Sequence, residues 1–144
     1  MSDKSFPDPD ASSIDLNTEI IKLLTWNVWW KFENYKEREN LIISEINNSC
    51  PDILCLQEVW EETDESQAKI IADQLGYNYI FKKSFEFDGV AFGNAIITKF
   101  PINSHHTVMF KTEAEKDEKR FLLHLSLKYK SCLLYTSPSP RDPS

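Results

Sequence analysis

The sequence predicts a mixed α/β fold in which helices pack on a layered β-sheet. Two short apolar runs, IIKLLTWN and DILCLQE, are separated by a segment with helical spacing. A second amphipathic segment follows, and after it the chain alternates strand-like runs with turn residues. The expected order of elements is β-α-β-α-β-β-β-β, and this order is typical of α/β layered sheets.

The first strand–helix–strand unit covers residues 20–60. Residues 20–24 form an apolar, β-branched run that is broken only by Lys22. Such a run is typical of a strand that is buried on both faces. We therefore expect a fully buried first strand that ends at Asn27.

The helix of this unit has a recognisable start and stop. Asn34 is the expected N-cap, and Glu37 stands three residues further on, where its side chain can reach back in a capping box. Helical spacing of apolar residues continues to Asn47, and Pro51 prevents the helix from resuming. Residues 53–56 form the next run of buried-strand type.

A second helix begins at Asp64 or Ser66. From Ala68 the apolar residues follow an i, i+3, i+4, i+7 stripe, and Gly76 is placed to cap the C-terminus. The remaining expected elements are strands over 77–81, 94–100, 106–110 and 120–130, a turn or loop over 85–93, and a charged, solvated loop over 111–119.

Composition divides the chain into three parts. Residues 1–18 are polar, acidic and rich in Ser and Pro, which predicts a disordered lead-in. Residues 19–131 carry the predicted domain. Residues 132–144 change abruptly in character, and CLLYTSPSPRD resembles a translated reading frame of a transposase adapter used in sequencing libraries. We expect this tail to be non-native, the alternative being a natural Pro-rich tail.

Charge and composition exclude several classes of protein. The net charge of -7 and pI near 5.0 argue against broad electrostatic binding to nucleic acid or anionic membrane. They do not exclude a nuclease, because a local basic patch or a bound cation can do that work. The chain has no transmembrane-length apolar stretch and no signal-peptide core, so a soluble intracellular protein is the default expectation. Three cysteines without CxxC spacing predict neither a disulfide framework nor a zinc site.

Two polar residues at strand ends carry the predicted chemistry. About 25 residues with one helix join the two strands, a length that suits a right-handed crossover between parallel strands. Asn27 and Glu58 then lie at the carboxyl ends of neighbouring strands, where open α/β sheets bind ligands. A carboxylate beside an amide suits Mg2+, which takes one or two protein carboxylates and keeps several waters.

Other interpretations of these residues stay open. Glu58 has the position of a helix cap or of one half of a surface ion pair, and Asn27 the position of a residue that closes a turn. Trp29, Trp30 and Phe32 could stack on a nucleobase. Packing over the adjoining helix is the interpretation that we favour for these aromatic side chains.

The motifs LLTWNVWW, PDILCLQEVW, GNAIITKFPI and RFLLHLSL together resemble those of the endonuclease/exonuclease/phosphatase superfamily, which has the deoxyribonuclease I-like fold. The resemblance covers residues 20–130. It implies the N-terminal half of a four-layer α/β sandwich with a mixed sheet, an incomplete domain. It also implies Mg-dependent hydrolysis of phosphate esters of the phosphodiesterase or nuclease type.

The resemblance gives roles to four residues of this chain. Glu58 matches the metal-binding glutamate and Asn27 the active-site asparagine, so both are candidate catalytic residues and candidate ligands of Mg2+, with Mn2+ as the alternative ion. Asn94 is a candidate substrate-binding residue, with a buried amide satisfied by the backbone as the other interpretation. Arg120 is a candidate for a structural or phosphate-steering role.

The chain departs from the family pattern in what it lacks. The family supplies a GDxN motif and a C-terminal Asp-His pair that this sequence does not contain. His105, His106 and His124 do not match the catalytic histidine. We therefore expect a truncated, inactive fragment of a longer enzyme, or a non-catalytic binding module on the same fold. A fragment that does not fold productively is a further alternative. DNA, RNA, tyrosyl-DNA links, inositol phosphates and sphingolipids are all candidate substrates within the superfamily.

Overall fold

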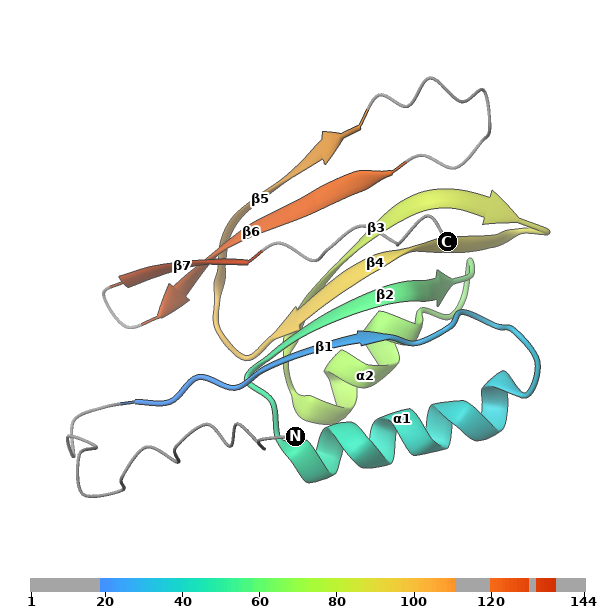
Figure 1. The fold of residues 1–144 in the computed structure, drawn as a ribbon, viewed down its shortest axis with the longest axis horizontal. Helices are drawn as coiled ribbons and strands as arrows, with labels where there is room; N and C mark the ends of the chain where they lie inside the picture. The colour runs from blue at the N-terminus through green and yellow to red at the C-terminus, as the bar shows by residue number, and fades with distance from the viewer. Residues whose placement is uncertain (1–18, 111–119, 130–131, 137–144) are drawn as a thin grey trace, which may run out of the picture.

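The structure, a computed structural model, describes residues 19–110, 120–129 and 132–136. Within these ranges the chain forms two helices and seven strands, arranged in two sheets of order β1-β2-β4-β3 and β5-β6-β7 (Figure 1). The elements are β1 Leu23–Asn27, α1 Tyr35–Ser49, β2 Ile53–Glu61, α2 Gln67–Leu75, β3 Asn78–Phe87, β4 Val90–Thr98, β5 Ile102–Met109, β6 Phe121–Tyr129 and β7 Cys132–Thr136.

The elements are stacked in layers, which confirms the predicted mixed α/β fold. Both helices cover one face of the four-stranded sheet, and the three-stranded sheet lies on its other face (Figure 1). The helix-facing cluster contains Val28, Ile42, Ile46, Leu54, Leu56, Val59, Ala68, Ile71, Ala72, Ala95 and Ile97. The inter-sheet cluster contains Ile53, Cys55, Ile96, Phe121, Leu123, Leu125 and Leu127. Burial of each large aliphatic side chain stabilises the fold by about 1.5–3 kcal/mol.

β1 and β2 are parallel, as the crossover length predicts, with Asn27 in register with Gln57. The expectation that the first strand is buried on both faces was wrong. β1 is at the edge of its sheet, and the side chain of Leu23 is 54% exposed. The strand also begins at Leu23 rather than at Ile20. An edge strand pairs on one side only, so its side chains are less buried than the apolar sequence of this run suggested.

α1 begins and ends differently from the prediction. Asn34 occupies the N-cap position, but its side chain makes no capping hydrogen bond, so the predicted capping box with Glu37 does not form. The helix continues past Asn47 to Ser49. Cys50 then ends it in the left-handed conformation (φ 46°), and its amide donates to the carbonyl of Ile46 at 3.0 Å.

α2 follows the sequence closely. The hydroxyl of Ser66 accepts a hydrogen bond from the amide of Lys69 at 3.4 Å, which is N-cap geometry. Gly76 has a φ of 69°, the left-handed C-cap conformation that glycine adopts without a Cβ penalty. Both predicted caps are confirmed.

β3 and β4 form one long hairpin. The turn consists of Asp88 and Gly89 alone, both with positive φ (52° and 78°), as a tight two-residue hairpin turn requires. The predicted loop over 85–93 was therefore too long, since the residues that flank the turn pair across the hairpin. The strand predicted from 106 begins at Ile102, because His105 and His106 pair with β6.

Some predictions lie outside the described residues: the lead-in over 1–18, the charged loop over 111–119 and the last part of the tail. The first part of that tail forms β7, which is antiparallel to β6. Whether residues 132–144 are native stays a prediction. Neither of the two helices in the described ranges has the length and apolar character needed to cross a bilayer.

Candidate active site

A β-bulge in β2 forms the centre of the candidate site. β2 pairs regularly with β4 up to Leu56 and again from Val59. Two residues of β2, Gln57 and Glu58, therefore lie opposite one residue of β4, Asn94. Bulges of this kind re-aim side chains and are frequent beside active sites.

The bulge changes the direction of the side chains along β2. Leu54 and Leu56 belong to the helix-facing cluster, and strict alternation would send Glu58 into the same apolar cluster. Instead Glu58 adopts a φ of 55°, and Val59 takes the next place in that cluster. The side chain of Glu58 is only 4% exposed. The prediction that Glu58 ends the strand was wrong, because β2 continues through the bulge to Glu61.

The segment after β1 continues to follow β2. The amide of Val28 donates to the carbonyl of Gln57 at 2.9 Å, and the amide of Trp30 donates to the carbonyl of Glu58 at 2.7 Å. The side-chain oxygen of Asn27 accepts from the amide of Trp29 at 3.0 Å. Asn27 is exposed at the surface while Glu58 is buried beside it, so the structure brings the two predicted residues to one place.

Backbone strain is concentrated at this place. Trp29 (φ 61°), Trp30 (φ 44°) and Glu58 (φ 55°) all adopt the left-handed conformation, which residues with a Cβ rarely take. Each such residue costs on the order of 1–3 kcal/mol and persists only when the surrounding structure holds it. Strain of this kind is common at functional sites.

Arg38 holds the strained segment from α1. Its Nε donates to the carbonyl of Val28 at 3.3 Å, and its Nη1 donates to that of Phe32 at 3.0 Å. Its Nη2 donates to the carbonyls of Trp29 and Trp30 at 3.1 and 2.9 Å. The guanidinium also lies over the ring of Trp29, 4.9 Å from its centroid. A planar fork of donors suits this work better than an ammonium group.

Arg38 was not among the predicted site residues. One signal for it was available in the chain. Arg38 stands in the first turn of α1, where a cation is unfavourable for the helix dipole. The loop carbonyls give Arg38 acceptors that offset this unfavourable position.

Aromatic side chains form a wall beside the site. The indole Nε1 of Trp30 donates to the carbonyl of Ala91 at 3.0 Å, and its ring contacts Phe92 and Phe87 at centroid distances of 6.1 and 6.3 Å. Trp30 therefore packs against the β3–β4 hairpin, whereas we expected packing over the helix. Trp29 is 45% exposed, so the part of its ring that Arg38 does not cover remains available on the surface.

Charged groups behind the site are paired. The ammonium of Lys31 bonds to the carboxylate of Glu62 and lies 4.2 Å from the centroid of the Trp60 ring. Burial is the largest single influence on the pKa of Lys31 and lowers it, but the hydrogen bonds and electrostatic attraction of Glu62 and Tyr35 together outweigh burial, so this pKa lies above its usual value. Glu39 accepts a hydrogen bond from the indole of Trp60 at 2.8 Å, and burial raises the pKa of Glu39.

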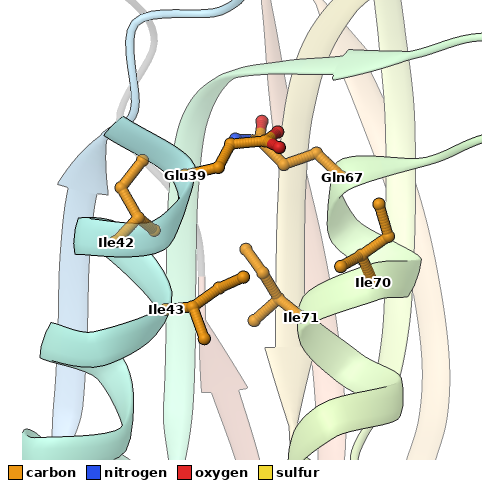
Figure 2. Close-up of a pocket in the computed structure, with 6 residues that line it drawn as sticks. All are labelled: Glu39, Ile42, Ile43, Gln67, Ile70 and Ile71. Carbon is orange, nitrogen blue, oxygen red and sulfur yellow. The ribbon is translucent and has the colours of Figure 1, made fainter. Parts of the chain in front are cut away.

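Glu39 also marks the polar end of a small cavity between the helices. Figure 2 shows Glu39 and Gln67 side by side at that end, with isoleucine side chains of α1 and α2 pointing toward one another below them. The cavity volume is about 10 Å³, which is the space of a single water at most. This cavity is a packing feature of the helix layer and has no room for a substrate.

The other two predicted site residues lie in different places. Asn94 is half-buried in β4, opposite the bulge on one side and Lys82 on the other, so it joins the row that Asn27 and Glu58 begin. Arg120 lies on the other sheet, one residue before β6, where its carbonyl accepts from the amide of Phe110 at 2.9 Å. The structure thus groups three of the four predicted residues on one sheet.

The donor set at the bulge fits a magnesium ion. Among the described residues no three His, Cys, Asp or Glu side chains come together as a metal cluster. Glu58 supplies one carboxylate, and Asn27 pairs with Gln57, the residue that precedes Glu58. A single carboxylate with a neutral oxygen donor is within what Mg2+ takes from proteins, since it keeps several waters.

Comparison with solved structures shows which proteins share this fold. An endonuclease/exonuclease/phosphatase family protein from Leptotrichia buccalis C-1013-b matches with a TM-score of 0.70 and 18% identity, over 83% of this chain and 54% of that one. TDP2 from Caenorhabditis elegans matches with a TM-score of 0.59 and 20% identity, over 81% and 34%. ANGEL2, a 2',3'-cyclic phosphatase, matches with a TM-score of 0.62 and 21% identity, over 81% and 40%. The chain thus spans about half the length of these proteins or less.

The sequence itself identifies the family. No curated protein sequence is similar enough to this chain to count as a match. The model of the Endonuclease/Exonuclease/phosphatase family, by contrast, matches residues 24–124, a range that includes the bulge and all four predicted site residues. Enzymes of this family are hydrolases of the nuclease and phosphatase type. The chain belongs to the endonuclease/exonuclease/phosphatase family.

Proposed function

We propose that Glu58 and Asn27 form the metal-binding part of a Mg-dependent phosphoesterase site, of the phosphodiesterase or nuclease type. The observation that carries the proposal is the bulge in β2. It gives a carboxylate a left-handed backbone, withdraws it from the apolar alternation of its strand and leaves it 4% exposed beside Asn27. Backbone strain and the burial of a carboxylate both cost free energy, and such costs are common at functional sites.

Each residue has a defined task in this proposal. The carboxylate of Glu58 binds the cation, and burial keeps the carboxylate in one orientation. The hydrogen bond from the Trp29 amide fixes the side-chain amide of Asn27, whose remaining oxygen lone pair could bind the cation and whose N–H groups could donate to a phosphate oxygen. Asn94 stands across the bulge, where a substrate contact would come from β4. Mg2+, or Mn2+ in its place, supplies positive charge that offsets the charge developing on the phosphate.

The substrate is a phosphate ester, and nucleic acid is a candidate. One of the similar structures is D. rerio TDP2 complexed with a single-stranded DNA product (TM-score 0.58, 18% identity). The exposed ring of Trp29 beside Asn27 offers a flat apolar surface at the site. A nucleobase adjacent to the scissile phosphate fits such a surface.

We further propose that this chain alone binds the metal without completing hydrolysis. The family motif that supplies a catalytic histidine has no counterpart among its residues, and the match covers 54% and 34% of two of the similar structures. The hydrolytic step then belongs to a longer parent protein that contains residues 19–131.

Hydrolysis of bis(p-nitrophenyl) phosphate and of single-stranded DNA by that parent, with Mg2+ and with EDTA, tests the proposal. We expect Mg-dependent turnover that falls by about 100-fold or more in Glu58→Gln, since the cation's charge is lost from the site. Glu61→Gln, on the same strand beyond the bulge, is the matched control and should retain activity. Full activity of Glu58→Gln would refute the metal role. Substrate binding without any turnover would favour a non-catalytic binding module.

A further inference from the structure

A pair of histidines faces each other on the three-stranded sheet. His106 of β5 and His124 of β6 are directly opposite in the antiparallel register. Their ring centroids are 4.5 Å apart, and the ring planes meet at 75°. The Nδ1 of His124 is 3.3 Å from the Nδ1 and 3.2 Å from the Nε2 of His106.

The pair lies on the face of this sheet that is turned away from the core. Leu123 and Leu125 of β6 belong to the inter-sheet cluster, so alternation places His124 on the opposite face. His106 shares that face because it stands opposite His124. His106 is exposed and His124 is half-buried, so the pair is open to solutes. Glu58, on the other sheet, has no part in it.

We propose that His106 and His124 form a two-histidine site for a late first-row transition-metal dication, with Zn2+ as the representative ion. The distances carry the proposal. Two imidazole nitrogens that bind one ion at about 2.0–2.1 Å with a tetrahedral angle are separated by about 3.3 Å. The nitrogen–nitrogen separations of 3.2 and 3.3 Å, which are also hydrogen-bond distances, show that the two rings are close enough to share an ion once they turn.

Little rearrangement is needed to bind. The Nδ1 of His124 is nearly equidistant from both nitrogens of His106, which places it over the face of the His106 ring. Rotation of the His106 ring about its Cβ–Cγ bond, which its exposed position permits, turns either nitrogen toward a shared ion. The backbone register fixes both Cα positions, so binding requires rotation of side chains and no change in the backbone.

Ligand chemistry selects the ion. Imidazole suits Zn2+, Cu2+ and Ni2+, whereas Mg2+ prefers oxygen donors. Two histidine ligands leave the remaining coordination positions of the ion to water, so we expect weaker binding than at a site with three or four protein ligands. The site is therefore distinct in place and in metal preference from the proposed magnesium site at Glu58.

Calorimetric titration of the untagged 144-residue chain with Zn2+, with imidazole NMR resonances followed in parallel, tests the proposal. We expect saturable binding of one Zn2+ that shifts the resonances of His106 and His124 and is unaffected by excess Mg2+. His106→Gln and His124→Gln should each weaken binding by at least about 10-fold, because one of two ligands is lost.

His105→Gln is the matched control, since His105 neighbours the pair in sequence and stands opposite Leu125, on the other face of the sheet. This variant and Glu58→Gln should bind Zn2+ as the unmodified chain does. Circular dichroism melts establish that all variants are folded. Failure to saturate with Zn2+, or equal weakening by His105→Gln and His106→Gln, would overturn the proposal. Unchanged affinity in folded His124→Gln would overturn it as well.

Discussion

The amide of Trp30 donates a 2.7 Å hydrogen bond to the carbonyl of Glu58, and both residues have a left-handed backbone. This bond joins the strained segment after β1 to the bulge in β2. It means that the position of the Glu58 carboxylate depends on the conformation of a loop that begins at Asn27. The loop after β1 and the bulge in β2 are therefore structurally coupled. Arg38 of α1 stabilises this loop by donating hydrogen bonds to the carbonyls of Trp29 and Trp30.

Replacement of Arg38 by Ala should destabilise the loop after β1 and, with it, the fold. Four carbonyl oxygens lose a charged donor, and we expect a loss of about 2–3 kcal/mol in the free energy of unfolding. Arg38→Lys should recover less than half of the loss, because an ammonium cannot span the same set of acceptors. Urea unfolding followed by tryptophan fluorescence measures this. Lys36→Ala, at an exposed position of α1, should change stability by less than about 0.5 kcal/mol. Equal effects of Arg38→Ala and Lys36→Ala would contradict the stabilising role of the Arg38 hydrogen bonds.

Gly93 of β4 lies beside the bulge at a position where the neighbouring strand leaves no room for a side chain. It pairs with Val59 on one side and with Lys83 on the other, and a Cβ at this position would overlap the carbonyl oxygen of Lys82. We expect Gly93→Ala to destabilise the fold by about 3 kcal/mol and to displace the adjacent Asn94. Thermal or urea unfolding reports the loss.

Gly89→Ala is the comparison for this substitution. Gly89 has a φ of 78° in the hairpin turn, and nothing lies within 4 Å of a Cβ built there. Only backbone strain is added, so a cost of about 1 kcal/mol is expected. A Gly93→Ala cost no greater than that of Gly89→Ala would show that β4 tolerates a side chain at this position.

Asp52 should make stability depend on pH at the other end of the sheet. Its carboxylate accepts from the amide of Lys22 at 2.7 Å and pairs with the ammonium of Lys99 at 2.5 Å. Burial raises the pKa of Asp52, but the bonds to Lys99 and Lys22 outweigh burial and hold it below its usual value. The folded state thus favours the ionised form. That stabilisation is complete above the unfolded pKa of about 3.9 and is lost as the pH falls through the folded pKa.

Asp52→Asn should accordingly cost about 1 kcal/mol at pH 7 and nothing at a pH below the folded pKa of Asp52. Urea unfolding at a series of pH values measures the difference. The control is Asp73→Asn, which removes an exposed surface pair with Lys69 and should have little effect at any pH. A cost for Asp52→Asn that does not change with pH would show that the carboxylate acts through packing alone.

Local chemistry explains which parts of the fold the sequence predicted. α2 was correct at both ends because Ser66 and Gly76 act through neighbouring backbone groups. A turn or loop was predicted within residues 85–93, and the turn lies there but is confined to Asp88 and Gly89, which both have positive φ values. The parallel pairing of β1 with β2 followed from the length of the crossover.

The features that escaped prediction depend on partners distant in the chain. The bulge requires Glu58 to adopt a conformation that its own propensity disfavours, so β2 was expected to end there. Apolar content alone did not show that β1 is an edge strand. The acceptors of Arg38 come within hydrogen-bond distance only when the loop after Asn27 is folded against α1. Asn27, Glu58 and Asn94 were nevertheless predicted as site residues, and the structure places them in one row across the sheet.

Metal binding by the carboxylate of Glu58 is the central claim, and Mn2+ is its most direct probe. The measurement is the electron paramagnetic resonance titration of the 144-residue chain with Mn2+, repeated for Glu58→Gln and for the control Glu61→Gln. We predict saturable binding of one Mn2+, displaced by Mg2+, that Glu61→Gln retains and Glu58→Gln abolishes. Equal binding of Mn2+ by the unmodified chain and by folded Glu58→Gln would contradict the account.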